Sequence, residues 1–278
     1  MNEKIEYKVL ARKYRPQTFA DLIGQETLVK ILTNAISTNR IANAYLLSGV
    51  RGVGKTTTAR LIAMSLNCEN KKDYSCEPCG TCDSCKSIRS DHNLDVIEMD
   101  AASKTGVDDV REIIDNVKYK PVNCKFKIFI IDEVHMLSKS AFNALLKTLE
   151  EPPEHVKFIF ATTEVKKIPI TILSRCQRFD LKRVESKDLI QHLKRISELE
   201  KVKVDEDAIS LLVRAGDGSV RDSLSLLDQA IINTDTSVSA ETVANMLGLA
   251  DRGKIYELLG HIAKGQASES LDLFRNLY

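Results

Sequence analysis

The glycine-rich stretch at residues 44–60, AYLLSGVRGVGKTTTAR, constrains the fold more than any other part of this chain. Its apolar start, Tyr45-Leu46-Leu47, predicts a buried parallel strand, and the segment from Lys55 onward predicts a helix. Between them stands G-x-x-x-x-G-K-T, the pattern of a phosphate-binding loop in its strand-to-helix context. A glycine-rich turn that merely precedes a lysine is the alternative, and composition alone produces the pattern in roughly one such chain in a hundred. We therefore predict a nucleotide site.

The loop supplies several groups suited to phosphate. Its glycines let backbone amides turn inward as an anion nest, and the positive end of the following helix adds to the attraction. Lys55 is expected to reach the β- and γ-phosphates of ATP, and the Thr56 hydroxyl is expected to ligate Mg²⁺. The candidate nucleotide-binding residues of this segment are Gly49, Val50, Arg51, Gly52, Val53, Gly54, Lys55, Thr56 and Thr57.

Two later strands are predicted to end beside this loop. Residues 126–131 form a continuous apolar run, as in a central parallel strand, and are followed by Asp132-Glu133. Asp132 could hold Mg²⁺ through water and Glu133 could polarise the attacking water, although an acidic pair can also merely cap a strand. Residues 156–161 predict another buried strand, and a hydroxyl of the threonine pair after it could sense the γ-phosphate or simply close the strand.

Cysteines are concentrated in one segment, because five of the seven fall between Cys68 and Cys85. Four of them stand at successive C-x-x-C spacings: Cys76, Cys79, Cys82 and Cys85. Paired C-x-x-C turns place two thiolates on one side of a knuckle, which suits tetrahedral zinc. An iron–sulfur cluster or redox thiols are the alternatives, but cluster ferredoxins have a wider last spacing followed by proline. One cysteine of the five is surplus, and spacing alone does not identify it.

Composition limits the other functions. Charged residues make up 28% and the net charge is +1, so any nucleic-acid contact requires a local patch or an assembly. No apolar run approaches the ~20 residues that span a bilayer, and the first ten residues lack the apolar core of a signal peptide. Because the cysteines cluster rather than scatter, we expect a soluble protein of the reducing cytoplasm that does not associate with membranes.

The order of the expected elements predicts an α/β fold. An extended arm is expected at 10–24, because Pro16 disfavours a helical Arg15, and it is either a plain strap or a base-binding arm. Strands and helices then alternate to about residue 182, which indicates a doubly wound domain with a parallel sheet. The expected strands are 45–47, 94–99, 126–131, 156–161 and 178–181, and the helices are 25–38, 55–67, 107–118 and 139–151. Beyond them the pattern is purely helical, at 186–200, 205–215, 219–233, 239–247, 252–264 and 267–277. The Ser219-x-x-Asp222 pattern predicts a cap on the third of these helices and leaves Arg221 in its first turn.

These features together resemble the AAA+ ATPases of bacterial clamp loaders, and among them the gamma/tau subunit family of DNA polymerase III. The segments that carry the resemblance are LARKYRPQTFADLIGQE, AYLLSGVRGVGKTTTARLIA, the cysteine knuckle, IDEVHMLSKSAFNALLKTLEEPPEHVKFIFATTE, IPITILSRCQRFD and GDGSVRDSLSLLDQA. The match runs from about residue 7 to residue 231, and the ordered combination is highly specific.

The resemblance implies roles for single residues. It makes residues 49–56 the Walker A loop and Asp132-Glu133 the Walker B pair, and it places Thr163 at the sensor 1 position. Arg175, which would otherwise be read as a solvated arginine, corresponds to an arginine finger that acts on ATP held by a neighbouring subunit. Arg221 corresponds to sensor 2, which reaches this chain's own γ-phosphate. The 10–16 arm and Ile23 correspond to the adenine pocket, whose residues are Ala11, Tyr14, Pro16 and Ile23.

The resemblance also implies a zinc ligand set and a domain order. The family's ligands fall on Cys68, Cys79, Cys82 and Cys85, which leaves Cys76 as the extra cysteine. Residues 1–182 are expected to form the nucleotide-binding domain with a zinc-binding insertion at 68–85, and 183–247 a helical lid. Residues 248–278 are expected to begin a helical collar that holds the ring of subunits together, so the chain looks like a fragment of a longer protein.

The function implied is that of an ATP-driven motor subunit that helps open the sliding clamp and place it on primed DNA for DNA polymerase III. The cofactors are ATP, Mg²⁺ and Zn²⁺. The partners are delta, delta-prime and further gamma/tau subunits, the sliding clamp, primed DNA gripped through phosphate contacts by the assembled loader, and the polymerase core through regions beyond this chain. The alternatives are a catalytically silent structural subunit, like delta-prime, and a related branch-migration motor.

Overall fold

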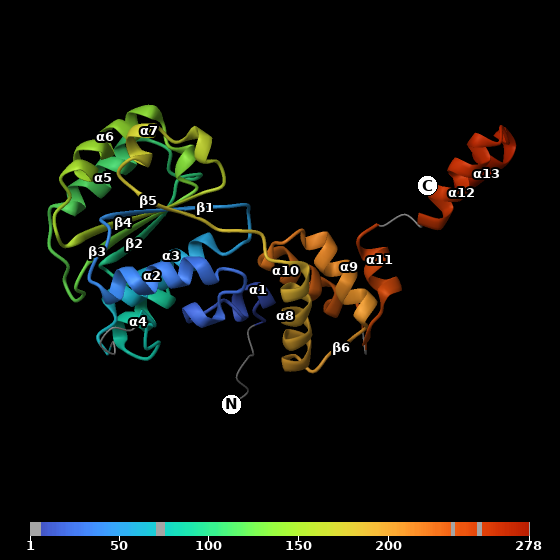
Figure 1. Cartoon of the computed structure of the whole chain (residues 1–278), viewed down its shortest axis with the longest axis horizontal. Coiled ribbons are helices and arrows are strands. Elements are labelled where there is room, and N and C mark those ends of the chain that lie inside the picture. The colour runs from blue at the N-terminus through green and yellow to red at the C-terminus, as the bar shows by residue number, and fades with distance from the viewer. Residues whose placement is uncertain (1–6, 71–75, 235–236, 249–251, 278) are drawn as a thin grey trace. The chain divides into compact units, whose positions relative to one another are not determined.

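The computed structural model describes residues 7–70, 76–234, 237–248 and 252–277. Residues 1–6, 71–75 of the predicted zinc insertion and 249–251 at the start of the predicted collar lie outside the described residues. Contacts divide the chain into two compact units (Figure 1). The first contains residues up to Asp188 together with Gly218–Asp222, and the second contains Leu189–Asp217 and the residues from Ser223 onward.

The first unit is built on a five-stranded parallel sheet, which confirms the predicted α/β fold. The strands are β1 (Ala44–Ser48), β2 (Val96–Asp100), β3 (Lys127–Asp132), β4 (Val156–Thr162) and β5 (Gln177–Asp180). Their order across the sheet is β2-β3-β4-β1-β5. Because β1 and β4 are neighbours, with Ser48 opposite Thr162, the loop after β1 and the threonine pair after β4 leave the same edge of the sheet. The tip of β3 lies on the other side of β4.

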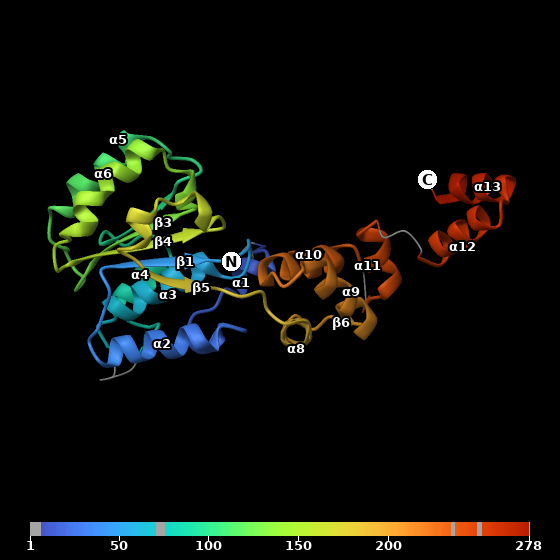
Figure 2. The same ribbon diagram turned by 45° about the horizontal axis from the view of Figure 1, so that its top comes forward.

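Helices cover both faces of this sheet (Figure 2). One face packs against α2 (Glu26–Ser37), α3 (Lys55–Asn67) and α4 (Asp83–Arg89), and the other against α5 (Val107–Val117), α6 (Lys139–Glu150) and α7 (Ile170–Leu173). Successive strand residues point to opposite faces, so Ile130 joins the first core and Ile131 the second. Both are fully buried, which explains why β3 is apolar along its whole length rather than alternating.

Two details at the N-terminal side differ from the expectation. The arm at 10–24 is not extended, because it contains the short helix α1 (Leu10–Lys13) and a 3₁₀ turn, η1 (Phe19–Asp21). Pro16 restricts only the residue before it, and the buried Leu10 anchors α1 ahead of that point. The second strand begins at Val96 instead of residue 94, and Leu94 is 71% exposed.

The second unit is mainly helical. Its elements are α8 (Ser186–Leu199), α9 (Glu206–Gly216), α10 (Val220–Ile232), α11 (Ala240–Met246), α12 (Arg252–Ala263) and α13 (Ala267–Leu277); α8 and α10 each begin in the first unit. The prediction of a purely helical region is wrong at one point, because β6 (Lys203–Val204) pairs with β7 (Ser237–Val238). Val238 is fully buried, and its carbonyl accepts the Asp205 amide, so a short ladder is favoured there. The helices of the described residues are too short or too polar to cross a membrane.

Candidate functional site

The loop between β1 and α3 has the geometry that its glycines permit. Gly49, Gly52 and Gly54 have φ values of 151°, 77° and 99°, in the region that disfavours other residues. A Cβ on Gly52 would lie 1.9 Å from Ser219 Oγ, and one on Gly49 would lie 2.7 Å from the Leu181 carbonyl oxygen. Glycine is therefore required at 49 and 52 by close packing as well as by backbone conformation.

Lys55, the first residue of α3, is the buried cation of this loop. Lys55 is 5% exposed, and its Nζ donates to the carbonyl oxygens of Gly49 and Val50, each at 3.0 Å. Burial lowers the pKa of Lys55, against the opposing effect of the Glu133 and Asp132 carboxylates. The ammonium is thus bonded to the loop and feels the negative charge at the tip of β3.

Arg221 adds positive charge near Lys55, and Arg15 lies near Arg221. Burial is the main cause of the lowered pKa of Lys55, and the charge of Arg221 lowers it further, while the two carboxylates oppose the shift. Burial, then the charges of Arg60 and Arg221, lower the pKa of Arg15. The Arg221 amide also donates to the Gly52 carbonyl oxygen at 3.2 Å, so the predicted sensor 2 residue lies at the loop. This cluster of cations suits a polyphosphate.

Thr56 and Asp132 lie together, as a shared magnesium site requires. Thr56 Oγ1 donates to Asp132 Oδ2 at 2.6 Å, and the Glu133 amide donates to Asp132 Oδ1 at 2.9 Å. A hydroxyl and a carboxylate are the hard oxygen ligands that Mg²⁺ prefers. These two residues would hold the ion directly or through water.

Glu133 is turned toward the end of β4. It adopts the left-handed conformation, with φ 45°, and its Oε2 accepts the Thr163 amide at 3.2 Å and the Thr163 hydroxyl at 3.0 Å. The structure therefore joins the predicted Walker B glutamate to the predicted sensor 1 threonine.

His135 is a residue of this site that the sequence analysis missed. Its Nδ1 is 3.3 Å from Glu133 Oε2 and 3.0 Å from Thr162 Oγ1. The available signal was a histidine two residues after the acidic pair, within the otherwise apolar VHML.

Arg175 is held by its own chain. It follows α7, ion-pairs with Glu150 of α6, and donates from Nη1 to the Thr171 carbonyl oxygen at 2.6 Å. These contacts hold Arg175 against α6 and α7 instead of at the Lys55 cluster.

The predicted adenine residues lie along the N-terminal arm. Ala11 is in α1, and Tyr14, Pro16 and Ile23 follow it; all four are partly exposed. The end of the arm is fixed beside the loop, because Gln25 Nε2 donates to the Lys182 carbonyl oxygen at 2.9 Å, next to the residue that packs on Gly49.

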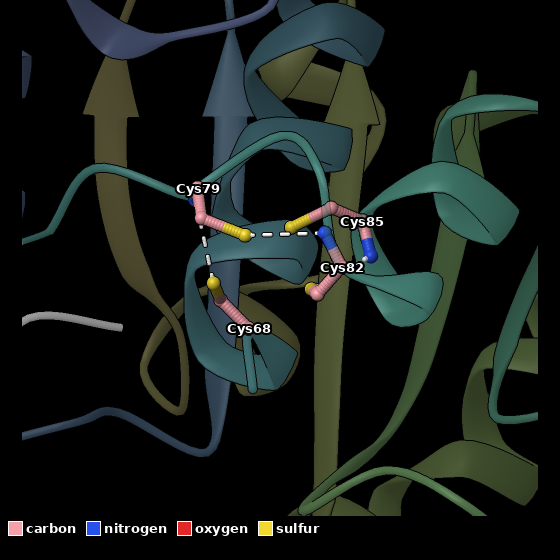
Figure 3. Close-up of side chains that lie close together, drawn as sticks. All are labelled: Cys68, Cys79, Cys82 and Cys85. Carbon is pink, nitrogen blue, oxygen red and sulfur yellow. Dashed lines mark hydrogen bonds between the residues drawn. The ribbon is translucent and has the colours of Figure 1, made fainter. Parts of the chain in front are cut away.

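The cysteine segment forms a separate candidate metal site (Figure 3). The sulfurs of Cys68, Cys79, Cys82 and Cys85 all lie within 4.8 Å of one another. Tetrahedral zinc with Zn–S bonds of about 2.3 Å needs sulfurs about 3.8 Å apart, so the cluster fits this ion after small adjustments. Cys76 points elsewhere, and its sulfur is 2.9 Å from Thr33 Oγ1.

The pKa values of these thiols differ within the cluster. Amides of Cys82 and Thr81 lower the pKa of Cys79 to about 6, whereas burial raises the pKa of Cys68 and Cys85. Buried thiols are costly to ionise without a compensating charge, and a metal ion supplies that charge.

Family models match three consecutive parts of the chain. They are described as DNA polymerase III, delta subunit (residues 24–185), DNA polymerase III clamp loader subunit, ATPase lid domain (188–236), and DNA polymerase III subunits gamma and tau domain III (238–278).

Curated relatives agree with these matches. DNA polymerase III subunit tau/gamma of Haemophilus influenzae is 51% identical over 261 residues, which is 94% of this chain and 38% of the relative. DNA polymerase III subunit tau of Escherichia coli is 52% identical over 255 residues, 92% of this chain and 39% of the relative. DNA polymerase III subunit gamma of Buchnera aphidicola subsp. Acyrthosiphon pisum is 45% identical over 273 residues, 98% of this chain and 75% of the relative. The chain therefore spans about two fifths of the first two relatives.

A solved structure supports the fold at a greater distance. The Thermotoga maritima RuvB Holliday junction branch migration motor superposes with a TM-score of 0.59 at 18% identity, over 91% of this chain and 80% of that chain. At this identity the likeness shows a shared fold and nothing about function. The family models and the curated relatives, by contrast, agree on one group of proteins. This chain belongs to the gamma/tau family of DNA polymerase III clamp-loader subunits.

Proposed function

We propose that this chain binds and hydrolyses ATP as a motor subunit of the clamp loader, which opens the sliding clamp and places it on primed DNA. The observation that carries the proposal is the convergence of three groups at one edge of the sheet. Lys55 lies on the loop, Thr56 bonds to Asp132, and Glu133 lies beside Thr163. Such a set can bind phosphates, hold a metal ion and activate water.

Each group has a defined part in the proposed reaction. The loop amides and Lys55 bind the phosphate oxygens, and Arg221 adds a second cation near them. Mg²⁺, held by Thr56 and Asp132, would neutralise charge on the phosphates. Glu133 accepts a proton from the attacking water, while Thr163 fixes the orientation of its carboxylate.

Lys55→Ala tests the proposal. The variant should fold normally and bind ATP on the order of 100-fold more weakly, because a buried cation at the phosphates is lost. Lys139→Ala is the matched control, since Lys139 is also the first residue of a helix but is exposed. Nucleotide binding and turnover would be measured with circular dichroism as the folding check. Unchanged binding and turnover in folded Lys55→Ala protein would refute the phosphate-loop function.

Arg175 is proposed to complete the ATP site of a neighbouring subunit. Arg175→Ala should bind ATP normally but fail to support hydrolysis of the ATP bound by the neighbouring subunit. Such arginines contribute on the order of 10³–10⁵ in rate. The test mixes Arg175→Ala chains with Lys55→Ala chains in one assembly, with Arg178→Ala as the control for loss of a nearby exposed arginine. If activity depends on Arg175 in the chain that binds ATP, instead of in its neighbour, the role in trans is wrong.

Further parts of the proposal concern assembly and metal. We propose domains at 1–182, 183–247 and 248–278, in the order nucleotide-binding domain, lid and collar. The partners would be delta, delta-prime and gamma/tau subunits, the clamp, primed DNA and the polymerase core, in the cytoplasm. The four-cysteine cluster would hold a structural Zn²⁺. A silent structural subunit is the alternative, and the intact loop and acidic pair favour an active one; an ATP-binding assay separates the two.

A further inference from the structure

We propose that His135 is a positioning residue for Glu133, acting through a hydrogen bond from Nδ1 to the Glu133 carboxylate. The inference rests on the proposed ATPase function. The His135 ring contacts Glu133, the proposed general base, and Thr162, which precedes the proposed sensor threonine.

The surroundings of His135 are unusual for a titratable side chain. It lies in η2 (Val134–Met136), a 3₁₀ turn directly after β3, and its side chain is only 6% exposed. Its neighbours Val134 and Leu137 are buried apolar residues. A buried polar ring is stabilised only where its nitrogens find partners, so the contacts of the ring define its role.

Both ring nitrogens face acidic groups. Nδ1 is 3.3 Å from Glu133 Oε2, and Nε2 is 3.5 Å from Glu164 Oε1. The Thr162 hydroxyl, 3.0 Å from Nδ1, already accepts the Glu164 amide at 3.0 Å. An imidazole nitrogen without hydrogen would direct its lone pair at a carboxylate, which is repulsive. The proposed hold on Glu133 uses the ring form with a hydrogen on Nδ1; in the other tautomer Nδ1 would accept the Thr162 hydroxyl hydrogen and Nε2–H would point to Glu164.

This donor completes a set around one oxygen of Glu133. The Thr163 amide, the Thr163 hydroxyl and His135 Nδ1 all approach Oε2. Together they would hold the carboxylate and leave Oε1 to accept a proton from water. Because Glu133 has a left-handed backbone, its side chain depends on such contacts for its direction.

The position of the ring also links two strand ends. Thr162 is the fully buried last residue of β4 and lies opposite Ser48, the last residue of β1 before the phosphate loop. His135 thereby ties the acidic tip of β3 to the tip of β4. A displacement of the ring would move the general base relative to the loop, and misplacements of about 1 Å can cost on the order of 100-fold in rate.

Two amide variants of the full-length protein in its assembled loader test the proposal. His135→Asn places an amide donor near the position of Nδ1, and His135→Gln places one near Nε2. We expect His135→Gln to lower kcat for ATP hydrolysis on the order of 10- to 100-fold, with KM and ATP binding within about 2-fold of wild type. His135→Asn should keep most of the wild-type kcat.

A purely structural role would give another pattern. The proposal is overturned if folded His135→Gln hydrolyses ATP at the wild-type rate, if His135→Asn is as slow as His135→Gln, or if the variants raise KM with kcat unchanged. Thermal unfolding identifies variants that do not fold. Each His135 variant that folds is then combined with Glu133→Gln. In the double variant the His135 substitution should not lower the single-turnover rate of hydrolysis below that of Glu133→Gln alone. If it lowers the rate by the same factor in the presence of Glu133 as in the Glu133→Gln background, His135 does not act through Glu133.

The proposed function fails in a different way. If a loader that carries Lys55→Ala turns over ATP as fast as the wild-type loader, the proposed ATP site itself is wrong. If Lys55→Ala abolishes turnover while His135→Gln does not affect it, only the role of His135 is wrong.

Discussion

The choice of zinc ligands can be tested by comparing Cys68→Ser with Cys76→Ser. Spacing alone does not decide between Cys68 and Cys76, whereas the structure places the Cys68 sulfur with those of Cys79, Cys82 and Cys85. Cys76 is 5% exposed, and its sulfur contacts Thr33 Oγ1 at 2.9 Å. The two substitutions are chemically identical and differ only in which sulfur they remove.

The expected effects differ in size. Structural zinc sites contribute about 10–16 kcal/mol of apparent binding free energy, so an equal share for each of four ligands is about 3 kcal/mol. Cys68→Ser should therefore weaken zinc binding on the order of 100-fold and lower the free energy of unfolding of the first unit. Serine at 76 can still bond to Thr33, so Cys76→Ser should cost about 1 kcal/mol and keep about one zinc per chain.

Metal content would be measured by mass spectrometry on purified protein, and zinc affinity by competition with a chelator. Denaturant unfolding with and without the chelator would show whether stability depends on the metal. Loss of zinc from Cys76→Ser but not from Cys68→Ser would refute the ligand set read from the structure. Iron in place of zinc would refute the identity of the metal.

Two further predictions concern the first unit. Glu133→Gln should bind ATP and hydrolyse it on the order of 10²–10⁴-fold more slowly in the assembled loader, because an amide does not take a proton from water; near-wild-type turnover would exclude Glu133 as the base. Asp95 is 1% exposed and accepts the amides of Val122, Asn123 and Cys124, which outweigh the effect of burial and lower its pKa. Asp95→Asn should therefore lower the free energy of unfolding by about 2–4 kcal/mol at pH 7. A carboxylate with a lowered pKa stabilises the fold above the unfolded-state pKa of about 4, and that stability is lost as pH falls through the folded value. The difference between wild type and Asp95→Asn in denaturant unfolding should accordingly shrink below about pH 4, and a constant difference would contradict this account.

The sequence by itself determined the sheet and the phosphate loop, because both depend on local signals. Gly52 has φ 77°, and a glycine in that pattern between an apolar run and a helix indicates one kind of loop. Residues 126–131 are apolar without interruption because β3 is buried on both faces, so their composition alone revealed a central strand. The acidic pair after them was found for the same reason.

Predictions that needed more than a local signal were less accurate. Pro16 correctly excluded a helix at Arg15, but it carried no information about α1, which is anchored by the burial of Leu10. The β6–β7 pair joins residues more than thirty positions apart in a region of helical periodicity. Two-residue strands leave too short a pattern to recognise.

Only the tertiary structure decided which side chains meet. Equal C-x-x-C spacings made Cys76 as good a ligand as Cys79, and only the family resemblance argued otherwise. In space, the end of α3 carries the Cys68 sulfur to within 4.8 Å of the other three, while Cys76 turns to Thr33. His135 meets Glu133 and Thr162 because the turn after β3 packs beside the end of β4. Such contacts depend on how separate elements pack, and a pattern along the chain records the elements without recording the distances between them.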